Sequence, residues 1–387
     1  MNSDRVSCWR LAPRWLAPWL VVTLVIACGG GVGTGGTGAF ASGPITGFGS
    51  IIVEGIHFDD SAARIEDDDS SGRSRDDLRL GTMVEVESGE IREGAASASQ
   101  VRIVSSLIGS VESVAAEALV VNGLTVRVNA GTVIDDRFVG GIAAIAVDRV
   151  VEVFGFVSAS EIVATRIKPK DGATTYKFRG MMSAMNSQAR TFDIGNQHFS
   201  YAGSVGGINE LRDGAFVRVV VGLQPDALGR WIVSAVGNTG PGNVDRDQAK
   251  ARGVITTFAS NANFAVGGTV VDASAAEIVG GPLAAGLRVE VEGRLQAGVL
   301  IASSVKVEDN DHHDEIEIRG AIATLDPLAK VLTISGRSER VSYARNDIEY
   351  DKGTVADLVA GQPVRVFGQL SADGTLVEAT RIRFDNK

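Results

Sequence analysis

Short runs of alternating apolar and polar residues recur in the same order five times between residues 43 and 387. Alternation with a period of two predicts β-strands that bury one face. The clearest run reads Gly-x-x-Val-x-Val-x-Gly and stands at Gly286–Gly293 and Gly361–Gly368, with looser copies at Gly81–Ser88, Asp148–Gly155 and Gly214–Val221. We therefore expect five copies of one all-β unit.

Each copy opens with a short predicted strand that contains a glycine. A hairpin follows, because a Gly or Asn-Gly turn separates two alternating apolar runs. A less regular stretch, in which we expect at most one short helical turn, leads to the Val-x-Val strand. The last strand reads Ala-x-x-Ile or Ala-x-x-Val. The opening glycines are Gly47, Gly109, Gly180, Gly253 and Gly320.

Five or six short strands in a unit of this length, with little helix, are the content of a small closed barrel of the OB type. An immunoglobulin-like sandwich needs about 100 residues, and a β-solenoid has a coil period of roughly 20 to 30. A unit of this size buries only about 60% of its unfolded surface, so we expect neighbouring units to stabilise one another. The predicted repeats span residues 43–106, 107–173, 174–240, 241–315 with linkers, and 316–387.

The first 27 residues have the pattern of an export signal. Arg5, Arg10 and Arg14 precede an apolar run over residues 15–27. The run is shorter than the about 20 residues that span a bilayer, and it fits the apolar segment of a secretory signal. It ends in Val25-Ile26-Ala27-Cys28, which resembles a bacterial lipobox whose cysteine takes the lipid. The alternative is an ordinary signal peptide with a cysteine nearby.

Residues 28–42 are rich in glycine and carry no charge, which predicts a flexible tether. The segment Gly31–Gly36 matches G-x-G-x-x-G by letter. A dinucleotide-binding loop needs a strand before it and a helix after it, and neither is predicted here. We therefore expect the segment to be part of the tether.

The charge and cysteine content limit the classes of partner. The net charge of the chain is −10, and removal of the signal, with three arginines and one aspartate, takes it to −12. An acidic chain is a poor binder of nucleic acid, which requires a positive face. Cys8 leaves with the signal and Cys28 would be acylated, so the remaining chain has neither a disulfide nor a cysteine metal site.

The chain resembles a family of bacterial lipoproteins known only as a domain of unknown function, in which tandem OB-like barrels follow a lipobox. The resembling residues are Ala27–Gly31, Gly43–Asp59 and the recurring Val-x-Val-x-Gly and Ala-x-x-Ile lines. Inner-membrane lipoproteins commonly carry Asp after the cysteine, so Gly29 implies sorting to the outer membrane. The resemblance implies fold and location and transfers no activity.

Two acidic clusters are the best candidates for a site. The first is Glu66–Asp69 with Asp76 and Asp77, where a solvated loop neutralised by Arg73 and Arg75 competes with a Ca²⁺ site. The second lies before the fifth repeat, where adjacent histidines among carboxylates suit a divalent transition ion. A charged spacer between barrels is the competing interpretation. The candidate ligands of this second cluster are Glu308, Asp309, Asp311, His312, His313 and Asp314.

The remaining histidines and aromatic residues favour structural roles. His57 and His198 each precede a Phe in the second hairpin strand, so they face outward if Phe58 and Phe199 face the core. Glycan sites use exposed aromatic platforms, and Tyr201, Tyr343 and Trp231 are the candidates for one. We favour residues at the edge of the core for both tyrosines.

The sequence contains no H-E-x-x-H, G-x-S-x-G or P-loop motif. We therefore expect a non-enzymatic, outer-membrane lipoprotein that forms a scaffold or interaction surface in the cell envelope. The alternative is a binding module for a divalent cation or an envelope glycan. Its partners would be the membrane, through the lipid on Cys28, and envelope proteins or glycans, but not nucleic acid. We expect no other cofactor. Because the recurring residues all have structural reasons, function should lie in those that do not recur.

Overall fold

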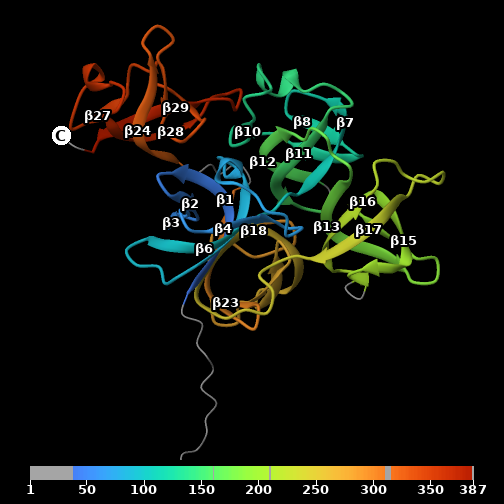
Figure 1. Ribbon diagram of the computed structural model, residues 1–387. Helices are drawn as coiled ribbons and strands as arrows, with labels where there is room; N and C mark the ends of the chain where they lie inside the picture. Colours follow the sequence, from blue (N-terminus) through green and yellow to red (C-terminus); the bar gives the residue numbers. More distant parts are fainter. Residues whose placement is uncertain (1–37, 160, 209–210, 310–314, 386–387) are drawn as a thin grey trace, which may run out of the picture. The chain divides into compact units, whose positions relative to one another are not determined.

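The computed structural model describes residues 38–159, 161–208, 211–309 and 315–385. Strands form 57% of the chain, and the strands build several small closed barrels of five or six strands. Figure 1 colours these barrels in chain order. No helix in the described ranges is long and apolar enough to cross a membrane. The all-β prediction with OB-like barrels is confirmed. The segments that contain Cys28 and most of the histidine cluster lie outside the described residues.

The first barrel consists of β1 (Ala39–Phe48), β2 (Ile51–Val53), β3 (Ile56–Asp59), β4 (Arg64–Asp67), β5 (Met83–Ser88) and β6 (Ala95–Ile103). The second consists of β7 (Leu107–Val114), β8 (Ala118–Val121), β9 (Leu124–Arg127), β10 (Val133–Ile134), β11 (Val150–Val157) and β12 (Glu161–Pro169). The third consists of β13 (Tyr176–Asn186), β14 (Thr191–Ile194), β15 (Gln197–Gly206), β16 (Phe216–Val221) and β17 (Trp231–Asn238).

The fourth barrel consists of β18 (Arg246–Ser260), β19 (Asn263–Val266), β20 (Thr269–Asp272), β21 (Glu277–Val279), β22 (Arg288–Gln296) and β23 (Val299–Glu308). The fifth consists of β24 (Ile316–Asp326), β25 (Val331–Ile334), β26 (Arg340–Ser342), β27 (Glu349–Asp351), β28 (Pro363–Leu370) and β29 (Val377–Phe384). The 3₁₀ turns η1 (Arg75–Asp77), η2 (Gly141–Ala144) and η4 (Val355–Asp357) stand before the Val-x-Val strands of barrels one, two and five.

All five barrels close by the same pairings. In the first, β1 pairs antiparallel with β2 and β5, β2 with β3 and β5 with β6, while β3 and β6 close the barrel in parallel. The parallel closing pair recurs as β9–β12, β15–β17, β20–β23 and β26–β29. Closure leaves each short sheet without long free edges, which would otherwise favour aggregation. The alternating Val, Ile and Leu residues of the five copies face inward and are buried.

The glycine of each opening strand makes room for the hairpin that folds over it. A Cβ on Gly180 would lie 2.4 Å from Ile194 Cγ2, and one on Gly320 would lie 2.6 Å from Ile334 Cγ2. Real Cβ atoms do not approach this closely without displacing the neighbour, so a side chain here would push the hairpin away from the first strand. The recurrence of glycine therefore has a steric cause.

The barrels contact one another through their first strands. Residues 39–42 of β1 pair in parallel with 248–251 of β18, and Gly47 and Phe48 of β1 pair in parallel with β24. The first strands of barrels two and three, β7 and β13, also pair with each other, but antiparallel. Barrels one and five share one buried apolar cluster, and barrels two and three share another. The first barrel thus contacts barrels that are distant in sequence, and not only its neighbour.

The start of β1 shows that the predicted boundary between the tether and the first barrel was placed too late in the chain. Residues 39–42 were expected in the flexible tether, but they form strand, and Ala39, Phe40 and Ala41 are buried. The reason is that this part of β1 lies between β5 and β18 and forms backbone hydrogen bonds with both. The glycine-rich composition upstream of Ala39 gave no sign of this pairing, because it depends on a strand that lies some 200 residues later in the chain.

Candidate functional site

The residue between the two valines of the Val-x-Val strand is charged in every barrel and faces outward. Each of these side chains forms an ion pair with a neighbouring strand or barrel, for example Glu85 with Arg102 at 2.8 Å and Arg365 with Glu317 at 3.4 Å. Outward charges at this position therefore link strands and barrels. The five residues are Glu85, Glu152, Arg218, Glu290 and Arg365.

The first acidic cluster forms an ionic clasp with the third barrel. We use this name for the ion pairs of Asp68 and Asp69 with Lys177, Arg179 and Arg218. Arg179 Nη2 lies 2.7 Å from Asp68 Oδ2, and Lys177 Nζ lies 2.6 Å from Asp69 Oδ2. Lys177 also pairs with Asp68, and Arg218 pairs with Asp69. Burial raises the pKa of the Asp68 carboxyl, but Arg179 and Lys177 outweigh this effect, and the net pKa lies below its ordinary value.

The expectation of a solvated loop was wrong for Glu66, Asp67 and Asp68, whose carboxylates are buried. Glu66 and Asp67 are buried, and Arg73 Nη2 lies 2.6 Å from Asp67 Oδ2, as expected for a neutralising cation. Arg75 instead pairs with Asp60 at 2.8 Å. The carboxylates of Asp67, Asp68 and Asp69 lie close enough to hold a metal ion, but cations and backbone amides of the chain already contact their oxygens. The cluster thus fastens barrel one to barrel three.

The second acidic cluster begins in a buried ion network. Glu308 ends β23, and its Oε2 lies 3.2 Å from Arg252 Nε and 3.4 Å from Arg288 Nε. Arg252 Nε also lies 3.2 Å from Glu54 Oε2 of the first barrel. Asp309 is exposed. Asp311, His312, His313 and Asp314 lie outside the described residues, so the predicted metal site stays a prediction. The network shows that Glu308 already has two cationic partners.

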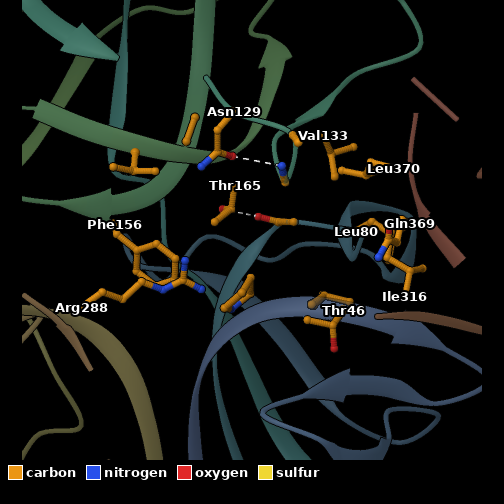
Figure 2. Close-up of a pocket in the computed structure, with 17 residues that line it drawn as sticks. Thr46, Leu80, Asn129, Val133, Phe156, Thr165, Arg288, Ile316, Gln369 and Leu370 are labelled. Atoms are coloured by element: carbon orange, nitrogen blue, oxygen red, sulfur yellow. Dashed lines mark hydrogen bonds between the residues drawn. The ribbon is translucent and has the colours of Figure 1, made fainter. Parts of the chain in front are cut away.

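A pocket of about 150 Å³ lies where barrels one, two, four and five meet, and we call it the junction pocket (Figure 2). Its lining is mostly apolar and includes Ile45, Leu80, Val133, Ile316 and Leu370. The pocket opens to solvent, and Figure 2 shows its side chains converging from strands of different colours. No sequence motif marked it, because each barrel contributes only a few of its residues.

The polar side chains of the junction pocket are largely engaged. Thr165 Oγ1 donates to the carbonyl of Gly81 at 2.6 Å, and Asn129 Oδ1 accepts from the amide of Gly131 at 3.0 Å. The guanidinium carbon of Arg288 lies 4.2 Å from the centre of the Phe156 ring. The ion pair of Arg288 with Glu308 leaves the pocket without net charge. The pocket therefore suits a small, neutral and mostly apolar group.

The histidines lie as expected. Phe58 and Phe199 are fully buried, and the His57 and His198 side chains are 40% and 66% exposed. His57 Nε2 lies 3.9 Å from Glu317 Oε2 of barrel five, whereas His198 Nδ1 lies 2.7 Å from Asp193 Oδ1 within its own hairpin. Both histidines are paired with carboxylates at the surface.

The aromatic candidates belong to the cores. Tyr201, Trp231 and Tyr343 are each at most 8% exposed. Trp231 Nε1 donates to Gln197 Oε1 at 3.0 Å, and the Tyr343 hydroxyl donates to the carbonyl of Asp326 at 3.3 Å. The polar atoms of Trp231 and Tyr343 thus have protein partners, and the buried rings of all three residues are not available as a stacking platform.

Three segments of the chain match a known domain. Residues 108–168, 252–306 and 319–383 each match the Domain of unknown function (DUF5666). They fall within the second, fourth and fifth barrels, so this domain corresponds to one OB-like barrel. A comparison with curated proteins finds no match.

Proposed function

We propose that the protein is a lipid-anchored, non-enzymatic scaffold of the bacterial cell envelope. In this proposal the lipid on Cys28 holds the chain in the outer membrane, and the barrels present a surface to other envelope components. The lipobox-like residues 25–28 and Gly29 support the anchor and its sorting. The three DUF5666 matches support repeated units without an assigned activity.

The observation that carries the proposal is the use of the charged residues at the barrel junctions. In the described residues, Asp68, Glu308 and Glu152 each have at least two cationic partners on neighbouring strands or barrels. A general acid, base or nucleophile must keep a reactive atom directed toward substrate. Charged side chains that form ion pairs between strands and barrels instead support a scaffold, which holds a surface in a fixed position.

The scaffold role is tested by cross-linking in intact cells followed by purification of the full-length chain. We expect one or a few envelope proteins to be enriched over a control lipoprotein of similar abundance. The matched variant Asp68→Ala should weaken the capture of partners that contact both barrel one and barrel three. Enrichment indistinguishable from the control lipoprotein would argue against the scaffold.

The anchor is tested separately by replacing Cys28. The Cys28→Ala variant should fail to be processed by the lipoprotein signal peptidase and should not incorporate labelled fatty acid. Ala27→Arg, which alters the cleavage position and keeps the cysteine, should show the same defect in processing. A Cys28→Ala chain that is processed normally and fractionates with the outer membrane would refute the anchor.

A further inference from the structure

Leu328 is the most exposed large apolar residue of the described chain, at 98%. It stands at the tip of the β24–β25 hairpin and is held there by local hydrogen bonds. Asp326 Oδ1 accepts from the backbone amides of Leu328 at 2.9 Å and Ala329 at 3.0 Å. A single exposed leucine is common in proteins, but this one is presented on a loop with fixed geometry.

The junction pocket has the size and polarity to receive such a side chain. Its volume is about 150 Å³, and a cavity on the order of 150 Å³ accepts a benzene-sized apolar guest. A leucine side chain has only four carbon atoms, so it fits this space. At the rim, Gln369 is exposed and is free to hydrogen-bond the backbone that accompanies the inserted residue.

Leu328, which we call the knob, and the junction pocket lie at opposite ends of one strand. Ile316, which lines the pocket, opens β24, and Leu328 lies two residues after Asp326, which ends it. The strand has 11 residues, which span on the order of 30 Å. One molecule therefore cannot fill its own pocket with its own Leu328. A second copy can, and each copy then still presents one free knob and one free pocket.

We propose that Leu328 of one copy of this chain inserts into the junction pocket of a second copy, and that repetition of this head-to-tail contact builds a linear array. A contact between different surfaces of two identical molecules does not close on itself unless the rotation happens to form a ring. The proposal deepens the scaffold function and rests on it, because the array forms on the membrane surface.

The contact is weak on its own. A loop tip buries much less than the about 1,200 Å² of a stable interface. Confinement of lipid-anchored copies to one surface raises their effective concentration, in the way that a linker does for two joined modules. Chains confined to a membrane surface should therefore associate. The same chain should be monomeric when it is diluted in detergent.

The test uses full-length chain in proteoliposomes, labelled with donor or acceptor dyes at Ser187→Cys, an exposed turn position away from knob and pocket. We expect energy transfer above that of randomly distributed molecules. Leu328→Asp should lower the association constant about 10- to 100-fold, the equivalent of one buried leucine side chain. The matched control is Leu228→Asp, because Leu228 is 75% exposed and its amide is also bonded to an aspartate, Asp226.

A complementation experiment tests the direction of the contact. Gln369→Trp should block the pocket and reduce energy transfer as much as Leu328→Asp does. A mixture of Leu328→Asp donors and Gln369→Trp acceptors keeps one intact pocket and one intact knob per pair, so transfer should return to the level of a dimer. Because both positions are exposed, circular dichroism should show unchanged folding for each variant.

Random-level transfer for the unsubstituted chain, or equal losses for Leu328→Asp and Leu228→Asp, would overturn the proposal. Failure of the mixed variants to associate would also overturn the head-to-tail contact. None of these results touches the scaffold function itself, which fails only if cross-linking captures no envelope partner. The two failures are therefore distinguishable.

Discussion

The ionic clasp gives the sharpest stability prediction. Asp68→Ala removes the carboxylate that pairs with both Lys177 and Arg179, while the volume change is small. The side chains of Asp68, Lys177 and Arg179 are only 6%, 5% and 7% exposed. Removal of Asp68 therefore leaves two buried cations without their main partner. Breaking a buried ion pair by removing one partner costs about 3–5 kcal/mol.

We expect a value near the lower end of this range, about 3 kcal/mol. The reason is that Lys177 keeps Asp69 as a partner at 2.6 Å, and Arg218 also pairs with Asp69. Arg179 loses its carboxylate. The double variant Asp68→Ala with Arg179→Met should therefore be more stable than Asp68→Ala alone, because it removes the uncompensated charge as well.

The assay is urea unfolding followed by the fluorescence of Trp231, the only tryptophan after Trp19 and a core residue of barrel three. Urea is preferred to guanidinium chloride because salt screens charges. Asp347→Ala is the matched control, since Asp347 pairs with Arg345 but is 70% exposed, and it should leave the midpoint unchanged. The reasoning is refuted if Asp68→Ala shifts the midpoint no more than this control does, or if the double variant is the less stable one.

The remaining predictions concern other parts of the chain. Gly180→Ala places a Cβ 2.4 Å from Ile194 Cγ2 and should cost about 1–3 kcal/mol in the same urea assay, whereas Gly222→Ala, with open space around it, should be neutral. Burial raises the pKa of Glu152, but Lys168 and Lys170 outweigh this effect and hold that pKa at about 2. Above pH 4.5, Glu152→Gln should lower the free energy of unfolding by about 3 kcal/mol. This difference from the unsubstituted chain should vanish as the pH falls to about 2. Identical pH profiles for the two chains would contradict the assignment. Calorimetry with Ca²⁺, Zn²⁺, Cu²⁺ and Ni²⁺ should show binding that is lost when His312 and His313 become Ala if the predicted metal site exists, and flat traces would end that hypothesis.

The sequence was sufficient to predict the fold of one unit. Alternation in Val-x-Val-x-Gly indicates a half-buried strand, and the steric needs of Gly180 and Gly320 explain why glycine recurs there. These features depend on contacts within about 70 residues, so each copy carries its own complete pattern. Five copies of that pattern then predict a small barrel five times over.

The contacts between barrels could not be predicted in the same way. The clasp joins residues such as Asp68 and Arg179, which are 111 positions apart, and β1 pairs with strands that begin only at Arg246 and Ile316. A nearest-neighbour array gives no reason to expect either contact. The acidic cluster was visible in the sequence, but its partners were not, so a solvated loop and a cation site were the natural interpretations.

Differences between the copies nevertheless carry the missing information. Phe156 occupies a position after the bulge glycine where the fourth barrel has Arg294 and the fifth has Gln369, and it is buried against other barrels in the junction. Copy one also has the shortest first hairpin, because Ile51 of β2 lies four residues after Gly47, whereas Phe264 of β19 lies eleven residues after Gly253. Barrel five lies directly against this strand, since a Cβ on Gly47 would be 2.2 Å from the backbone oxygen of Glu317 in β24. A longer hairpin would occupy the space that barrel five needs. The shared pattern therefore specifies the barrel, and departures such as Phe156 specify neighbouring barrels. The exposed departure Leu328 is the one for which we propose a neighbour outside the chain.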